Sequence, residues 1–148
     1  MQKQRLMVRT ALVTMAFFAT SCAVDQSVDG TVGEPIESYD GLLDALRENG
    51  STVESVGPIS QPFFVPEGQL ISVDGNEIQV FEFSTPQDAQ SSAESISPDG
   101  SSVGTSMIMW VEAPHFYRSG KLIVLYVGEE TTVVDALEVV LGAQIAGR

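Results

Sequence analysis

The apolar positions after residue 38 follow helical spacing in three segments of the chain. Three leucines recur at this spacing between Ser38, which can cap a helix start, and Asn49-Gly50, which can end one. Thr85-Pro86 starts a second helix, because threonine caps a helix and proline favours its first position. A third periodic segment runs from Thr131 to Leu141 and ends at a glycine. The pattern therefore predicts three short helices.

Six further segments have the composition of β-strands. The turn residues Asp74-Gly75-Asn76 join two of them and Ser119-Gly120 join two more, which predicts two hairpins. The sequence LIVLYV is apolar without alternation, as expected for a central strand that is covered on both faces. The predicted strands span residues 51–56, 69–73, 77–83, 107–111, 116–118 and 121–127.

The order of these elements predicts an α+β fold. We expect a single small domain with a mainly antiparallel sheet and helices packed largely on one face. A shift of 45 residues places Gly75 on Gly120 and Ile78 on Ile123, so that two hairpin–helix units correspond. This correspondence has two explanations, a duplicated ββα unit or two similar elements that obey the same local rules, and the sequence leaves both open.

The first 22 residues have the pattern of an export signal. Lys3, Arg5 and Arg9 form a basic start, and the 12 residues from Thr10 to Ser21 are mostly apolar and end in small residues. As a helix this run would be about 18 Å long, too short for a hydrocarbon core of about 30 Å. The segment ends Ala-Thr-Ser-Cys at Cys22, and in this it resembles the signal peptide of bacterial lipoproteins with its lipobox.

The resemblance implies that the chain is cut before Cys22, whose sulfur carries a diacylglycerol and whose new amine is acylated. It also implies a protein anchored by lipid in the bacterial cell envelope, facing the periplasm or the exterior. Ala19 departs from the leucine that is usual at the start of a lipobox. There are two alternatives to a lipidated Cys22. The segment is a plain secretory signal with an incidental cysteine, or Cys22 is a reactive or metal-binding thiol. The predicted organisation is a signal peptide at 1–21, a flexible acidic tether at 22–37 and an α+β domain at 38–148.

The charge balance of the chain limits its partners. Twenty acidic residues stand against seven cations, for a formal net charge of −13. Removal of the signal takes away three cations and no acid, which leaves −16. Nucleic acid and anionic lipid headgroups are poor partners for such a surface. The acids either form a solvated coat or bind a cation or a basic partner.

The sequence offers few groups for catalysis. It has one histidine, His115, no G-x-S-x-G motif, and a single cysteine that lipidation would block. A carboxylate-dependent hydrolase remains an alternative, because acids are abundant although no pair stands out. We therefore expect a non-catalytic protein with a binding or accessory role in the envelope, without a cofactor.

Met107, Met109 and His115 form the strongest candidate for a metal site. Two thioethers and an imidazole are ligands that suit copper, and Met107 and Met109 share one face of the predicted strand. Methionines in a strand more commonly fill a core. Copper handling is therefore an alternative function, and the main prediction is that no metal is bound.

A second candidate site surrounds the predicted turn at Ser119-Gly120. His115, Phe116, Tyr117, Arg118 and Lys121 combine aromatic rings with two of the few cations, and such rings can stack on a ligand. The alternative is a hairpin tip with solvated charges. If the patch binds, its partner is an envelope protein or a small ligand. The stretches ISPDGSS and APHFYRSGKLIVLYVG resemble short bacterial envelope lipoproteins without an assigned activity, so the resemblance transfers none.

Overall fold

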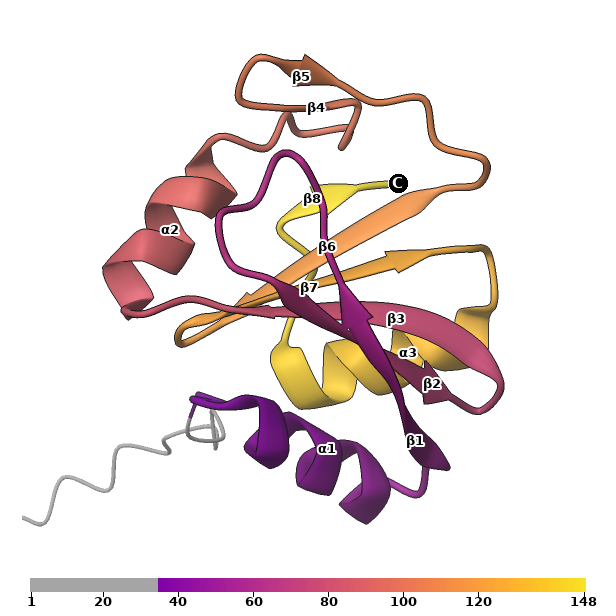
Figure 1. The fold of residues 1–148 in the computed structure, drawn as a ribbon. Coiled ribbons are helices and arrows are strands. Elements are labelled where there is room, and N and C mark those ends of the chain that lie inside the picture. The colour runs from indigo at the N-terminus through magenta and orange to yellow at the C-terminus, as the bar shows by residue number, and fades with distance from the viewer. Residues whose placement is uncertain (1–34) are drawn as a thin grey trace, which may run out of the picture. The chain divides into compact units, whose positions relative to one another are not determined.

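A computed structural model describes residues 35–148. The predicted signal peptide, Cys22 and most of the predicted tether lie outside the described residues. The described part forms a six-stranded sheet, three helices and a two-stranded ribbon (Figure 1). The elements are α1 (Tyr39–Glu48), β1 (Val53–Ile59), β2 (Gly68–Val73), β3 (Asn76–Glu82), α2 (Pro86–Glu94), β4 (Ser102–Val103), β5 (Ser106–Met107), β6 (Pro114–Ser119), β7 (Leu122–Val127), α3 (Thr131–Leu141) and β8 (Ala146–Gly147). This arrangement confirms the α+β fold class.

The large sheet is antiparallel throughout, in the order β1-β2-β3-β7-β6-β8. Strand β7 lies inside it, and the residues from Leu122 to Tyr126 are all buried, which confirms the prediction of a covered central strand. The two predicted hairpins, β2–β3 and β6–β7, meet through β3 and β7, where Ile78 lies opposite Tyr126. Residues far apart in the sequence thereby form one continuous sheet.

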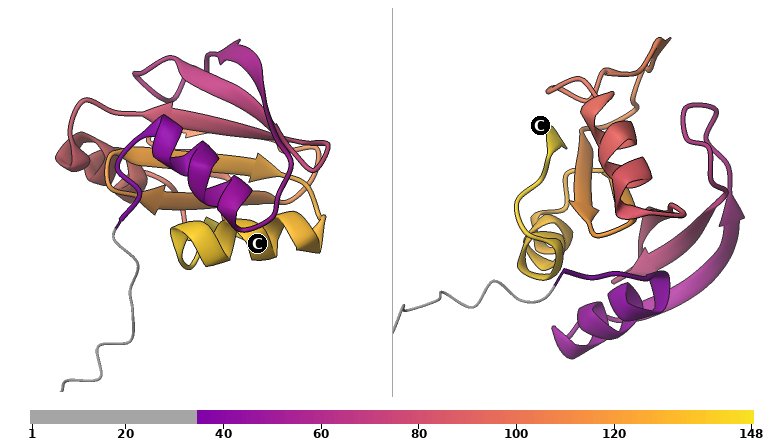
Figure 2. Two further views of the ribbon diagram at one scale, coloured as in Figure 1. Left: turned by 90° about the horizontal axis from the view of Figure 1, so that it is seen from below. Right: turned by 90° about the vertical axis from the view of Figure 1, so that its left-hand side faces the viewer.

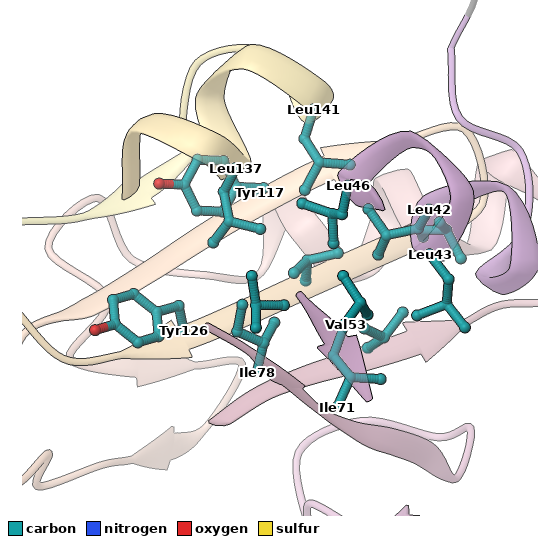
Figure 3. Close-up of a cluster of buried hydrophobic side chains, with 14 of the residues drawn as sticks. Leu42, Leu43, Leu46, Val53, Ile71, Ile78, Tyr117, Tyr126, Leu137 and Leu141 are labelled. Carbon is teal, nitrogen blue, oxygen red and sulfur yellow. The ribbon is translucent and has the colours of Figure 1, made fainter. Parts of the chain in front are cut away.

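Each face of the sheet has its own hydrophobic core. Helices α1 and α3 cover one face, and α2 covers the other together with the ribbon β4–β5 (Figure 2). In Figure 3 the leucines of α1 and α3 converge on Ile71, Ile78 and Tyr117 of the strands. Helices thus lie largely on one face, as predicted, with α2 as the exception. Burial of these apolar surfaces is the main favourable contribution to folding.

The two hairpin–helix units do not occupy equivalent places. Ile78 and Val80 of the first unit point into the core beneath α1 and α3. Their counterparts, Ile123 and Leu125, point to the opposite face and pack with α2. A two-fold axis normal to the sheet would place both helices on the same face, and they lie on opposite faces. The structure therefore gives no support to a symmetric duplication.

The chain enters the described domain at the β6–β7 turn. The backbone N–H of Ile36 donates to Ser119 Oγ at 2.8 Å, and that of Tyr39 donates to Glu82 Oε2 at 2.9 Å. Ile36 also packs against the core of α1 and α3. The folded part therefore includes residues that the sequence assigned to the tether. Of the helices within residues 35–148, none is both long and apolar enough to cross a membrane.

The structure departs from the sequence-based prediction between residues 102 and 113. The predicted strand at 107–111 is reduced to β5, which pairs with β4 across the turn at Gly104, and the following residues are irregular. Neither β4 nor β8 was predicted, because a strand of two residues is too short to show a periodic pattern.

Candidate functional site

A cleft of about 730 Å³ opens where the segment after β5, the start of α3 and the last residues of the chain meet. Part of its wall is apolar and comes from Ile108, Trp110, Val111, Pro114 and Val134. Carboxylates from three separate segments also line it, namely Asp99, Glu112, Glu129 and Asp135. A concave surface that combines apolar walls with a few charged groups is the usual form of a binding site.

Trp110 is held in the wall of this cleft by three contacts. Its indole Nε1 donates to the carbonyl oxygen of Gly100 at 2.7 Å. Its ring meets Phe116 edge-on at a centroid distance of 5.9 Å and Phe63 at 6.2 Å. Trp110 and Ile108 pack against the core of the α2 face. The segment that carries them is therefore fixed on its inner side.

The outer side of the same segment is apolar and exposed. Met107, Met109 and Val111 are 90%, 99% and 93% exposed, respectively, while Ile108 and Trp110 between them are partly buried. This alternation has the period of two that extended backbone gives. Three large apolar side chains thus face solvent beside the cleft, and they are the largest such group within residues 35–148.

Asp99 contributes a stable negative charge to the cleft. Its carboxylate accepts hydrogen bonds from the backbone N–H and hydroxyl of Ser101 and from the hydroxyl of Ser97. These bonds lower the pKa of Asp99 from 3.8 to about 2, with the Ser101 N–H as the largest cause. A general acid for glycoside hydrolysis needs a raised pKa, so Asp99 is unsuited to that role.

His115 lines the cleft but is held by its neighbours in the fold. It is 7% exposed, and both ring nitrogens have partners: Nδ1 lies 2.8 Å from Gln144 Oε1, and Nε2 lies 3.1 Å from the carbonyl oxygen of Gly128. The ring also stacks on Tyr126 at a centroid distance of 5.8 Å. His115 therefore connects β6 to Gly128 after β7 and to Gln144 after α3, and a protein oxygen lies against each nitrogen of the buried ring.

The candidate copper ligands are not brought together. Met107 and Met109 point to solvent from the exposed side of their segment, whereas His115 is buried and hydrogen-bonded. Met107 and Met109 do lie on one side of the segment, as predicted, but that side is exposed, so the alternative that they fill a core is wrong. The side that faces the core belongs to Ile108 and Trp110. Within residues 35–148, no three side chains of His, Cys, Asp or Glu are grouped so as to hold a metal ion.

The predicted aromatic and cationic patch is also divided. Phe116 and Tyr117 are both 0% exposed and point into opposite cores, because neighbouring strand residues alternate between the two faces. Lys121 Nζ lies 2.7 Å from Glu82 Oε1, and this contact, together with the N–H of Tyr39, lowers the pKa of Glu82. Arg118 donates to the carbonyl oxygen of Gly120 at 3.4 Å. The five residues therefore form no common recognition surface.

Of the residues that line the cleft, His115 was a candidate in the sequence, but the cleft itself was not predicted because its residues come from distant segments. The run from Ser106 to Glu112 did carry a signal: it is apolar at five consecutive positions, although the structure buries only alternate side chains of the run. The contributions of Asp99, Glu129 and Asp135 depend on tertiary contacts that no local pattern shows. Comparison of the chain with protein-family models, curated proteins and solved structures found no match.

Proposed function

We propose that the protein is a lipid-anchored, non-catalytic binding protein of the bacterial cell envelope, and that its cleft receives a partner. The observation that carries the binding role is the cleft itself, in which exposed apolar side chains lie beside several carboxylates. The anchored location is supported by the predicted export signal and by its resemblance, up to Cys22, to lipoprotein signal peptides. Two or more acyl chains suffice for stable attachment to a membrane.

The position of the cleft suits an anchored domain. The chain enters beside Ser119, at one end of β6, whereas the cleft lies beside Pro114 at the other end of the same strand. A strand of six residues spans about 20 Å. An anchor that precedes Ile36 would thus connect to the end of β6 that is remote from the cleft, which would leave the cleft accessible.

The anchor is tested with the full chain expressed in a bacterial host. Radiolabelled palmitate should be incorporated into the wild type and absent from Cys22→Ser, and the wild type should fractionate with membranes. Cys22→Ala serves as a second variant, because it removes the thiol without leaving a hydroxyl. Equal labelling of wild type and both variants would contradict the lipidation of Cys22.

The binding role is tested by photo-crosslinking in intact cells. A photoreactive side chain replaces Val111, which is 93% exposed and lines the cleft. The matched control replaces Val139, which is 71% exposed on α3. We expect one discrete crosslinked species from position 111, still present at low expression, and none from position 139. Absence of adducts at both positions, or equal adducts at both, would refute a partner in the cleft.

A further inference from the structure

We propose that the segment from Ser106 to Glu112 is the docking site for an extended, basic and partly apolar segment of a partner protein. This inference rests on the proposed function and specifies the chemistry of the partner. The site consists of the outer edge of β5, the exposed side chains of Met107, Met109 and Val111, and the carboxylates of the adjoining cleft. We call it the β5 edge surface.

Within the β5 edge surface, the two-residue strand β5 has one edge that is open to pairing. Within residues 35–148, β5 pairs with β4 alone, and the ribbon has two strands. Its other edge therefore offers backbone N–H and C=O groups to a new strand. Extended peptides commonly bind in this way, with main-chain hydrogen bonds for affinity and alternate side chains for specificity.

The side chains favour an extended partner with apolar residues at alternate positions. Met107, Met109 and Val111 project outward at a spacing of two residues. Their burial by a partner would remove apolar surface from water, and methionine adapts its shape to varied surfaces. The inner side of the segment is held by Trp110, so little ordering is needed on binding.

The charge of the surroundings selects a basic partner. Asp99, Glu112, Glu129 and Asp135 line the cleft beside the exposed side chains. Among the described residues that line the cleft, Arg148 is the one with a lysine or arginine side chain. His115 is buried and lies against Gln144 and Gly128. Lysine or arginine on the partner would complement this negative potential and speed association.

The negative charge of the cleft argues against two other partners that an exposed apolar surface suggests, namely a second copy of this chain and an anionic membrane. A second copy of this chain would bring the same carboxylates to the interface, and the chain has a formal net charge of −13. An anionic membrane surface would be repelled by the carboxylates that adjoin Met109 and Val111. A basic protein segment is the occupant that satisfies both the apolar and the acidic part of the surface.

The probe is a capped seven-residue peptide of alternating lysine and valine, titrated into the chain that lacks residues 1–22. All buried core residues within residues 35–148 lie between Leu42 and Ala146, and this truncation keeps them together with Ile36, which packs against one core. The chain has one tryptophan, and it lies in the cleft, so its fluorescence reports binding. We expect the Lys/Val peptide to bind at least about tenfold more tightly than Lys/Ser or Glu/Val peptides of equal length, since each lacks one of the two complementary features.

Variants locate the binding. Met109→Ser with Val111→Ser should weaken the Lys/Val peptide about tenfold or more, and Glu112→Gln should reduce the dependence of its affinity on salt. Val139→Ser with Glu48→Gln is the matched control, because it makes equivalent changes on exposed faces of α3 and α1. The control should bind as the wild type does. Circular dichroism verifies that every variant is folded.

Four results would overturn the inference. The first is no fluorescence change at millimolar peptide, and the second is equal affinity for the Lys/Ser and Lys/Val peptides. The third is unchanged peptide binding by the Met109→Ser, Val111→Ser variant. The fourth is that the wild type dimerises or binds phosphatidylcholine vesicles and that this variant abolishes either property. Crosslinks from Val111 without peptide binding would reject the extended basic segment and retain the proposed function. Peptide binding without crosslinks in cells would retain the docking surface and reject the envelope role.

Discussion

The indole nitrogen of Trp110 donates a hydrogen bond of 2.7 Å to the carbonyl oxygen of Gly100. This bond ties the segment after β5 to the turn before β4. It also sets the edge of the Trp110 ring against Phe116, which belongs to β6 of the large sheet. The exposed edge of the cleft is thereby fixed to the core, and Met109 and Val111 are kept on its outer side.

Replacement of Trp110 by phenylalanine should lower the free energy of unfolding by about 1 kcal/mol, the usual contribution of one hydrogen bond. The aromatic contacts with Phe63 and Phe116 are largely preserved in this variant. Urea unfolding followed by circular dichroism measures the change. Met109→Ser is the control, and it should shift stability by less than about 0.5 kcal/mol because the side chain is 99% exposed. Wild-type stability in Trp110→Phe would show that the bond does not hold the segment.

Gly147→Ala should detach β8 from β6. A Cβ at position 147 would clash with the backbone carbonyl of Pro114, and the backbone φ of +114° disfavours any side chain. Hydrogen exchange should accelerate at residues 145–148 while β7 stays protected. Gly142→Ala is the matched control, because its φ of +85° carries a similar strain but no atom lies within 4 Å. Equal exchange in both variants would show that the contact with Pro114 is unimportant.

Tyr117→Phe should leave stability unchanged or raise it by up to about 1 kcal/mol. The Tyr117 hydroxyl is buried, and no hydrogen-bond partner for it lies within the described residues. Tyr126→Phe is the matched control and should cost about 1 kcal/mol, because its hydroxyl accepts from the N–H of Glu130 at 3.2 Å. Urea unfolding at pH 8 distinguishes the two variants, and a marked loss in Tyr117→Phe would contradict the structure.

Tyr117 should also make the wild type less stable in alkali. Burial, together with the charges of Glu138 and Asp135, raises the pKa of Tyr117 from 10.0 to about 12. Above pH 10 the unfolded chain loses this proton while the folded chain keeps it, so stability falls as the pH rises towards 12. The fall between pH 9 and pH 11 should be smaller in Tyr117→Phe, and an identical pH profile would refute the raised pKa.

Asp99 should remain ionised in the folded protein until about pH 2. Its pKa is lowered, so its contribution to the turn is complete above about pH 4 and is lost as the pH falls towards 2. Carboxyl carbon shifts in an NMR titration measure this pKa. Ser101→Ala should raise it towards 3.8 by removing one hydroxyl donor. A value near 3.8 in the wild type would show that the bonds from Ser97 and Ser101 are not formed in solution.

The helices and the central hairpin could be predicted because their signals are local. Helix α1 begins after Ser38, whose side chain accepts from the N–H of Gly41, and α2 begins after Thr85, which caps it through the N–H of Asp88. The bounds of α3 at Thr131 and Leu141 were predicted without error, since Gly142 ends the periodic segment. Strands β4 and β8 gave no such signal, because strands of two residues form only where tertiary contacts hold them.

The amino-acid sequence by itself determined the class of the fold and the acidic character of the chain, because each follows from composition or spacing along the chain. The lipid anchor at Cys22 stays a prediction from the resemblance to lipoprotein signal peptides. Only the tertiary structure decided which side chains reach solvent. Phe116 and Tyr117 lie adjacent in the sequence and enter opposite cores, whereas Asp99 and Asp135 lie far apart and line one cleft. The physical reason is that strand pairing fixes the direction of every side chain, and pairing between distant segments leaves no mark on local periodicity.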